Sequence, residues 1–204
     1  MSTTQVPVEV YAEMTPNPGV MKFVANKRIL EGDSVEFHNI EEAKPSPLAS
    51  QLFHFPFVKE VFISTNFVAI SKFDVIEWEE VTHEVRGFIT EYLKEGKPVI
   101  TAPVDIKETA QETPSNITED IDPSNLDEVE TRIIEILEEY VKPAVAQDGG
   151  NIRYAGYENK IVRVQLQGAC SGCPSSTMTL KNGILNLMQK MLPTLVNDVE
   201  AING

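Results

Sequence analysis

The segment Ile161-Val162-Arg163-Val164-Gln165-Leu166-Gln167 decides the fold of the C-terminal half of this chain, because apolar and polar residues alternate along it. Such alternation is typical of a strand with one buried face, since successive side chains point to opposite sides of a sheet. The inward positions are Val162, Val164 and Leu166, and the outward positions are Arg163, Gln165 and Gln167. Residues 152–157 precede this strand and predict its hairpin partner.

Helical periodicity flanks the hairpin on both sides. One apolar stripe predicts a helix that ends before Pro143, because proline does not continue a helix. Its members are Leu126, Val129, Ile133, Ile136, Leu137 and Tyr140. Asp148-Gly149-Gly150 predicts the turn into the hairpin. A second helix is expected after Cys173 and is ended by Pro193, so the predicted order is helix, two strands, helix and a short tail.

Strands and helices also mix in the N-terminal half. Strands are predicted at residues 6–11, 21–24, 34–38, 58–65 and 67–73. Ser46 precedes Pro47 and predicts the N-cap of a short helix. A longer helix is predicted where apolar residues recur at helical spacing, and a glycine follows at its end. Those residues are Val81, Val85, Phe88, Ile89, Leu93 and Gly96.

The composition changes sharply between the two halves. Residues 101–122 are rich in Pro, Thr, Glu and Asp and contain no aromatic residue. Such a stretch buries too little apolar surface to offset the entropy lost on ordering. We therefore predict an α+β protein with two small α+β domains, at residues 1–100 and 123–204, joined by a flexible acidic linker at 101–122.

The charge of the chain excludes several classes of partner. Its formal net charge is −14, and no segment carries the basic stripe that a phosphate backbone requires, so nucleic-acid binding is not expected. Acidity also disfavours anionic lipid, and no apolar run reaches the length that crosses a membrane, so no membrane association is expected. Residues 1–10 have the character of neither a secretory signal nor a transit peptide, which predicts a cytoplasmic protein.

The chemistry converges on Gly168-Ala169-Cys170-Ser171-Gly172-Cys173-Pro174, which holds both cysteines of the chain. This loop joins the end of a strand to the start of a helix, and Pro174 fits the first helical position, which makes Cys173 the expected N-cap. A helix N-terminus presents unpaired N–H groups and partial positive charge, so it favours thiolate, the form that binds metal.

A C-x-x-C pair can ligate a metal, form a redox-active disulfide or lie in a core. The flanking Gly, Ser and Pro residues describe a loop and argue against a core. A thiol–disulfide oxidoreductase remains an alternative, although the predicted hairpin is not the βαβ context in which such dithiols occur. No catalytic acid, base or nucleophile arrangement accompanies the cysteines, so the chain is not expected to be an enzyme.

Counting ligands narrows the metal-binding alternative. A tetrahedral zinc site or an iron–sulfur cluster takes four protein ligands, commonly thiolates, and one chain supplies two. The three histidines lie in the other half of the chain, at His38, His54 and His83. Two thiolates from each of two chains would complete a cluster site, while a zinc-stabilised interaction module stays open as a further alternative.

These motifs resemble the Nfu family, whose C-terminal domain is that of NifU. In the C-terminal half the matching runs are residues 164–176, Thr179-Leu180-Lys181-Asn182-Gly183-Ile184, Val141-Lys142-Pro143 and Gln147-Asp148-Gly149-Gly150. In the N-terminal half they are Thr15-Pro16-Asn17-Pro18, Met21-Lys22-Phe23, Ser46-Pro47-Leu48-Ala49 and Leu52-Phe53. The resemblance implies a non-enzymatic scaffold or carrier for a [4Fe–4S] cluster, with Cys170 and Cys173 as ligands. It also implies a homodimer when the cluster is bound, an upstream cluster assembly machinery and apo iron–sulfur proteins as clients.

Overall fold

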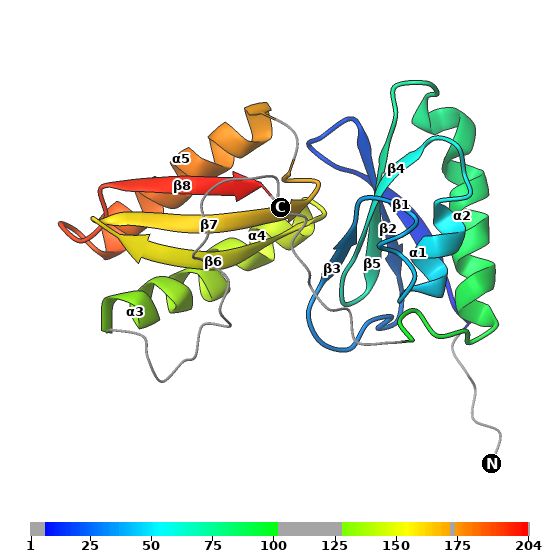
Figure 1. The fold of residues 1–204 in the computed structure, drawn as a ribbon, viewed down its shortest axis with the longest axis horizontal. Coiled ribbons are helices and arrows are strands. Elements are labelled where there is room, and N and C mark those ends of the chain that lie inside the picture. Colours follow the sequence, from blue (N-terminus) through cyan, green and yellow to red (C-terminus); the bar gives the residue numbers. More distant parts are fainter. Residues whose placement is uncertain (1–6, 102–127, 172–173, 204) are drawn as a thin grey trace, which may run out of the picture. The chain divides into compact units, whose positions relative to one another are not determined.

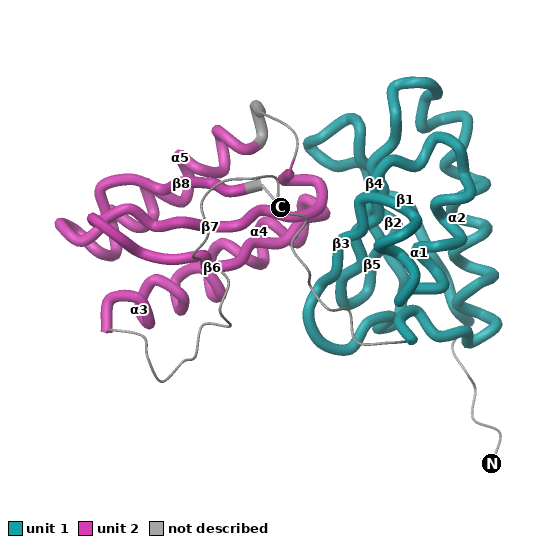
Figure 2. The backbone as a smooth tube through the Cα atoms, viewed as in Figure 1, with its two compact units in different colours: residues 1–105 teal, residues 106–204 magenta. Residues whose placement is uncertain are grey.

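A computed structural model of the chain describes residues 7–101, 128–171 and 174–203. The chain divides into two compact units, Met1–Asp105 and Ile106–Gly204 (Figure 2). Each unit combines helices with one β-sheet, so the α+β fold class with two small domains is confirmed. The acidic linker expected at 101–122 lies outside the described residues, apart from Thr101.

Unit 1 contains an antiparallel sheet of five strands in the order β1-β2-β5-β4-β3. Its elements are β1 (Val10–Met14), β2 (Val20–Ala25), β3 (Val35–Phe37), α1 (Pro47–Leu52), β4 (Val58–Ile63), β5 (Phe67–Lys72) and α2 (Trp78–Lys94). Both helices lie on the same side of the sheet (Figure 1). Apolar residues of α2 such as Val85 and Ile89 pack there against Phe23 and Ile70 in one core.

Two local predictions for unit 1 are confirmed at the ends of its helices. The Ser46 hydroxyl accepts a hydrogen bond from the Ala49 N–H at 3.1 Å and donates one to the Val99 carbonyl at 2.7 Å. An N-cap of this kind stabilises a helix by about 1 kcal/mol. Gly96 follows α2 with a φ of +68°, which glycine adopts without the strain that a Cβ causes.

The first strand is displaced from its predicted position at 6–11. Strand β1 begins at Val10 and pairs with β2 from Val10–Ala25 to Met14–Met21. The Asn26 side chain instead holds the chain before β1, because its amide donates to the Pro7 carbonyl and accepts from the Glu9 N–H. At Pro7 and Glu9 these side-chain bonds accompany one backbone hydrogen bond, from the Asn26 N–H to the Glu9 carbonyl at 3.0 Å, in place of a regular ladder.

Unit 2 contains a sheet of three strands in the order β6-β7-β8. Its described elements are α3 (Glu128–Ile136), a π-helical turn (Leu137–Val141), α4 (Lys142–Gln147), β6 (Gly150–Glu158), β7 (Ile161–Gly168), α5 (Pro174–Met191) and β8 (Asp198–Asn203). The predicted β6–β7 hairpin is confirmed, and Val162, Val164 and Leu166 are fully buried. They share one core with Ile133 and Ile136 of α3 and with Ile184 and Met188 of α5.

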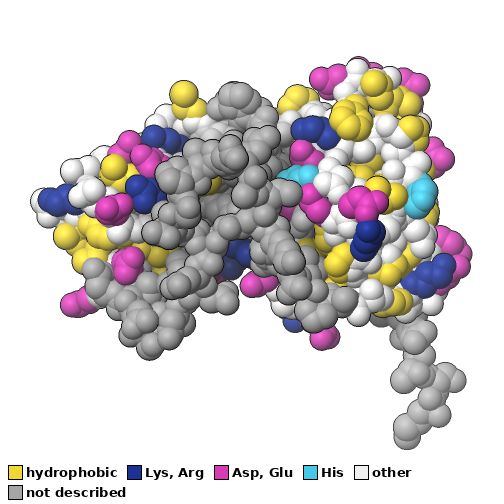
Figure 3. Space-filling model, in the orientation of Figure 1, with side chains coloured by type: hydrophobic (Ala, Val, Ile, Leu, Met, Phe, Trp, Pro, Cys, Tyr) yellow, Lys and Arg dark blue, Asp and Glu magenta, His cyan; other side chains and the backbone are white. Residues whose placement is uncertain are grey.

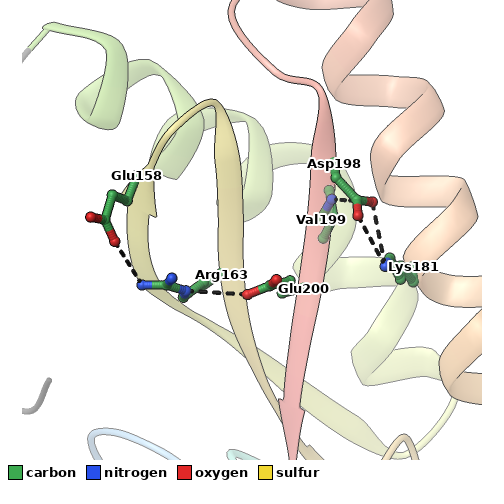
Figure 4. A network of polar contacts seen from close by, with 6 residues as sticks. All are labelled: Glu158, Arg163, Lys181, Asp198, Val199 and Glu200. Carbon is green, nitrogen blue, oxygen red and sulfur yellow. Dashed lines mark hydrogen bonds and ion pairs between the residues drawn. The ribbon is translucent and has the colours of Figure 1, made fainter. Parts of the chain in front are cut away.

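The C-terminal tail is a strand, which the sequence did not predict. Strand β8 pairs in parallel with β7, so β7, α5 and β8 form a βαβ unit. Arg163 on β7 bridges the neighbouring strands, because its guanidinium lies 3.3 Å from Glu158 and 3.2 Å from Glu200 (Figure 4). Lys181 on α5 lies 3.3 Å from Asp198 at the start of β8. The hydrogen bond from the Val199 N–H, followed by Lys181, lowers the pKa of Asp198.

The helix before the hairpin was predicted to end before Pro143. In the structure it continues through Pro143 to Gln147. Proline lacks an N–H and its ring clashes with the carbonyl four residues earlier, and the π-helical turn ahead of Pro143 absorbs this conflict. The wider turn also shifts the buried stripe. Val141 and Val145 enter the core, whereas Tyr140, which was predicted to lie in the stripe, is 49% exposed. Leu126 lies outside the described residues.

Basic side chains on the described surface commonly lie beside acidic ones. Examples are the pairs Lys44–Glu41, Lys97–Glu95 and Lys142–Glu138. Figure 3 shows Lys, Arg, Asp and Glu scattered over the visible face of both units among hydrophobic side chains. Exposed pairs of this kind contribute about 0–1 kcal/mol each, so they shape the surface potential more than the stability.

Candidate metal centre

The cysteine loop is framed by the first residue of β6 and the last residue of β7. Gly150 and Gly168 lie opposite each other in the antiparallel register, and Cys170 follows two residues after β7 ends. Gly149 and Gly168 have φ values of +84° and +67°. Glycine reaches this left-handed region at little cost, so both chain segments can turn sharply at the edge of the sheet.

Hydrogen bonds fasten the backbone on both sides of Cys170. The Ala169 N–H donates to the Gly149 carbonyl at 3.2 Å. The N–H and the hydroxyl of Ser171 both donate to the Gly168 carbonyl, at 3.0 and 2.8 Å. The Thr177 hydroxyl on α5 donates to the Cys170 carbonyl at 3.2 Å. These contacts tie the loop to the turn before β6, to the end of β7 and to α5, so the backbone of Cys170 is held on several sides.

Gly150 makes room for the Cys170 side chain. A Cβ atom at position 150 would lie 2.8 Å from Cys170 Sγ and 2.7 Å from the Gln167 carbonyl oxygen. Real Cβ atoms essentially never approach so closely, so a glycine is required here by packing. The sequence predicts Gly150 only as part of a turn. No sequence signal could have shown this contact, because position 150 touches Cys170 only after β6 and β7 pair.

The Cys170 thiol is buried, with 6% of the residue exposed, and it belongs to the core of unit 2. Burial, followed by the negative charge of Asp148, raises the pKa of this thiol to about 11. At neutral pH Cys170 is therefore protonated in the absence of a ligand. This corrects the expectation that the start of α5 favours thiolate at both cysteines, because at Cys170 the cost of desolvation is the larger effect.

The raised pKa predicts how Cys170 reacts with an alkylating reagent. Because only the thiolate reacts, the rate for Cys170 in the metal-free Cys173→Ser variant should rise about tenfold per pH unit until the pH approaches about 11. Peptide mapping after iodoacetamide treatment at pH 7, 8, 9 and 10 measures this. A rate that levels off below pH 9 would contradict the burial of the thiol.

Cys170 does not belong to a cluster of potential metal ligands within the part of the chain that the structure describes. In residues 7–101, 128–171 and 174–203, no group of three or more His, Cys, Asp and Glu side chains could hold a metal ion. His38, His54 and His83 all belong to unit 1. Cys173, the second predicted ligand, lies outside the described residues. Within the same parts of the chain, no helix combines the length and apolar character needed to cross a membrane.

Several proteins of similar sequence are named as iron–sulfur cluster scaffold homologues. The human protein "NFU1 iron-sulfur cluster scaffold homolog, mitochondrial" is 36% identical over 194 residues, which cover 95% of this chain and 71% of that protein. Proteins of the same name from Drosophila ananassae and Drosophila willistoni are 36% and 34% identical, and this chain spans 64% and 63% of them. A solution structure of a NifU-like protein from Saccharomyces cerevisiae is 25% identical, covering 50% of this chain and 91% of that one, with a TM-score of 0.43.

The names of these relatives correct one prediction made from the sequence. A cytoplasmic location was expected from residues 1–10, but the human and fly relatives are all named as mitochondrial. A transit peptide is removed from a mature protein, so the character of a chain's opening residues does not decide where it works. The cytoplasmic prediction is therefore wrong.

Two family models match the chain, one in each unit. The model described as scaffold protein Nfu/NifU N terminal matches residues 10–96, and the model described as NifU-like domain matches residues 133–200. The second match contains Gly150, Cys170, β7, α5 and the first residues of β8. With both models matched in order, and with a human scaffold homologue 36% identical along 95% of the chain, this protein belongs to the Nfu/NifU family of iron–sulfur cluster scaffolds.

Proposed function

We propose that this protein binds a [4Fe–4S] cluster as cargo between two copies of itself and transfers it to apo iron–sulfur proteins. Cys170 and Cys173 of each copy are the ligands in this proposal, and an upstream assembly machinery supplies the cluster. The observation that carries the proposal is the loop itself. Both cysteines of the sequence precede Pro174, and hydrogen bonds hold the backbone at Cys170 to Gly149, Gly168 and α5.

The number of ligands favours a shared cluster. A [4Fe–4S] cluster takes four thiolates, and one chain has two. A second copy related by a two-fold axis supplies the missing pair from the same patch of surface. No other group of potential ligands lies in the described parts of this chain, which agrees with a ligand set completed by a partner copy.

The packing of Cys170 suits a carrier rather than a permanent cofactor site. Its side chain is 6% exposed and lies in the core cluster against Gly150, so it has to leave this position to reach an iron atom. The free energy of that packing is lost when the cluster binds and is regained when the cluster leaves. A site built in this way holds its cargo less tightly than a site whose ligands already face the metal. We therefore infer a role in transfer, without a catalytic step.

One observation favours a second candidate. The βαβ arrangement of β7, α5 and β8 is the context in which redox-active C-x-x-C pairs occur, which removes the topological argument against a thiol–disulfide oxidoreductase. The raised pKa of Cys170 weighs against it, since such enzymes rely on a thiolate with a lowered pKa. The carrier is therefore the better supported function.

Anaerobic reconstitution with iron and sulfide tests the proposal. The expected result is a broad charge-transfer absorption in the visible range. When an apo iron–sulfur protein is then added, this absorption should move from the carrier to that protein. Parallel samples receive zinc, or an oxidant and glutathione. A colourless protein that retains zinc would support the zinc-stabilised interaction module instead. A Cys170–Cys173 disulfide that exchanges catalytically with glutathione would support the oxidoreductase.

A further inference from the structure

Helix α5 begins at Pro174, directly after the cysteine loop, and presents an uncovered side. Its residues Ile184 and Met188 enter the core of unit 2. On the other side lie Met178, Asn182, Gly183 and Asn186, which we call the α5 outer face and which are all exposed. Met178 is 66% exposed, so the α5 outer face combines one large apolar side chain with a glycine and two uncharged polar side chains.

The α5 outer face is uncharged in a strongly acidic protein. The chain has 31 acidic and 17 basic residues, yet α5 contains no Asp or Glu. The cations of α5 are Lys181, which lies 3.3 Å from Asp198, and Lys190 near its C-terminal end. A surface that meets its own copy across a two-fold axis brings each charge close to its equivalent, so charged residues there would repel. The α5 outer face avoids this repulsion.

A cluster shared by two chains would bring their cysteine loops together. If four thiolates from two chains hold one cluster, the loops of both chains converge on the two-fold axis. Cys170 is tied to the first turns of α5 by the Thr177 hydroxyl, at 3.2 Å from the Cys170 carbonyl oxygen. Met178 is the next residue of α5, so the beginning of the α5 outer face is carried toward the axis together with Cys170.

We propose that the α5 outer face packs against the same face of the partner copy when the cluster is bound. This inference rests on the proposed function, because the shared cluster is what brings the two helices together. The partner is a second copy of this chain, and the contact buries Met178 and the uncharged residues around Gly183. Cluster loading and closure of this contact then stabilise each other.

Two glycines allow a matched test. Gly183 in α5 and Gly87 in α2 both lie inside helices and are exposed, and a Cβ at either position would meet no atom within 4 Å. Gly183→Glu and Gly87→Glu therefore add the same charge and the same gain in helix propensity, in different units. Both variants should fold like the parent without cluster, which circular dichroism and thermal unfolding verify.

The experiment measures the mass of the reconstituted full chain across a dilution series, with iron counted per chain. Gly183→Glu should weaken the cluster-bound dimer by on the order of tenfold or more, because two negative charges are brought together at the contact. Gly183→Arg should weaken it similarly, and Gly87→Glu should leave it unchanged. Mixing the Gly183→Glu and Gly183→Arg chains before reconstitution should restore a dimer close to that of the parent, since opposite charges then meet.

Each outcome decides a separate statement. Parent-like dimers from both Gly183 variants would overturn the α5 contact while leaving the carrier function intact. Weak dimers that mixing does not restore would also overturn the contact, because charge at a self-facing surface is then not the cause. Failure of the parent itself to take up iron and sulfide would overturn the proposed function and this inference together.

Discussion

Replacing Cys170 by serine is expected to abolish stable cluster binding, and replacing Cys173 is expected to do the same. Each substitution removes one ligand from a chain and therefore two of the four ligands from a dimer. Serine is nearly isosteric with cysteine, so the packing of Cys170 against Gly150 is expected to survive. Iron should fall from about two atoms per chain in the parent to nearly none.

Sedimentation of the reconstituted protein, with iron and sulfide counted per chain, measures this effect. The parent should sediment as a dimer that returns to monomers on chelation, by mass action. Ser171→Ala is the control, because it removes one hydroxyl from the same loop and leaves both thiols in place. The shared-cluster proposal would be contradicted by a monomer that retains about four irons per chain. It would also be contradicted by a Cys170→Ser variant that binds as much iron as the parent.

Replacing Gly150 by alanine is expected to disturb both the stability of unit 2 and cluster loading. The new Cβ would lie 2.7 Å from the Gln167 carbonyl oxygen and 2.8 Å from Cys170 Sγ. The thiol can rotate away, but the carbonyl belongs to the β6–β7 ladder and cannot move without breaking register. Overpacking of this kind costs about 1–3 kcal/mol of unfolding free energy. The strain also shifts the backbone that holds Cys170 at the edge of the sheet, so the iron retained per chain should also fall.

Hydrogen exchange at the amides of β6 and β7 reports the loss of stability in unit 2. Trp78 is the one tryptophan of the chain and lies in unit 1, so its fluorescence on denaturation serves as an internal reference that should not change. Gly87→Ala is the matched control, since position 87 has open space and should gain about 0.5–1 kcal/mol from helix propensity. Equal protection and loading in Gly150→Ala and the parent would show that the loop adapts and that Gly150 does not position Cys170.

Local patterns predicted the elements whose residues interact with near neighbours. The β6–β7 hairpin follows from alternation in residues 161–167, and the start of α1 follows from Ser46 and Pro47. The failure at Pro143 is instructive. The rule that proline ends a helix is local, but the buried positions of Val141 and Val145 favour a helix that continues, with a π-helical turn to accommodate the ring.

In the candidate site, too, the sequence predicted some features and missed others. The two cysteines, their spacing and the number of ligands were available from the sequence, and they are what the proposed shared cluster rests on. The protonation of Cys170 was predicted with the wrong sign, because the sequence showed the helix start beside the thiol and not the core around it. Asp148, which adds to the raised pKa, also acts through space.

By itself, the sequence determined the α+β class, the hairpin, most helix ends and the pair of thiols, since each depends on residues close together in the chain. Only the tertiary structure decided that residues 198–203 form a strand, that the Cys170 thiol is buried, and that position 150 must be glycine. Arg163 meets Glu200 at a separation of 37 residues. Contacts of that kind exist only after the sheet has assembled, because backbone pairing and core packing, rather than local propensity, bring the two residues together.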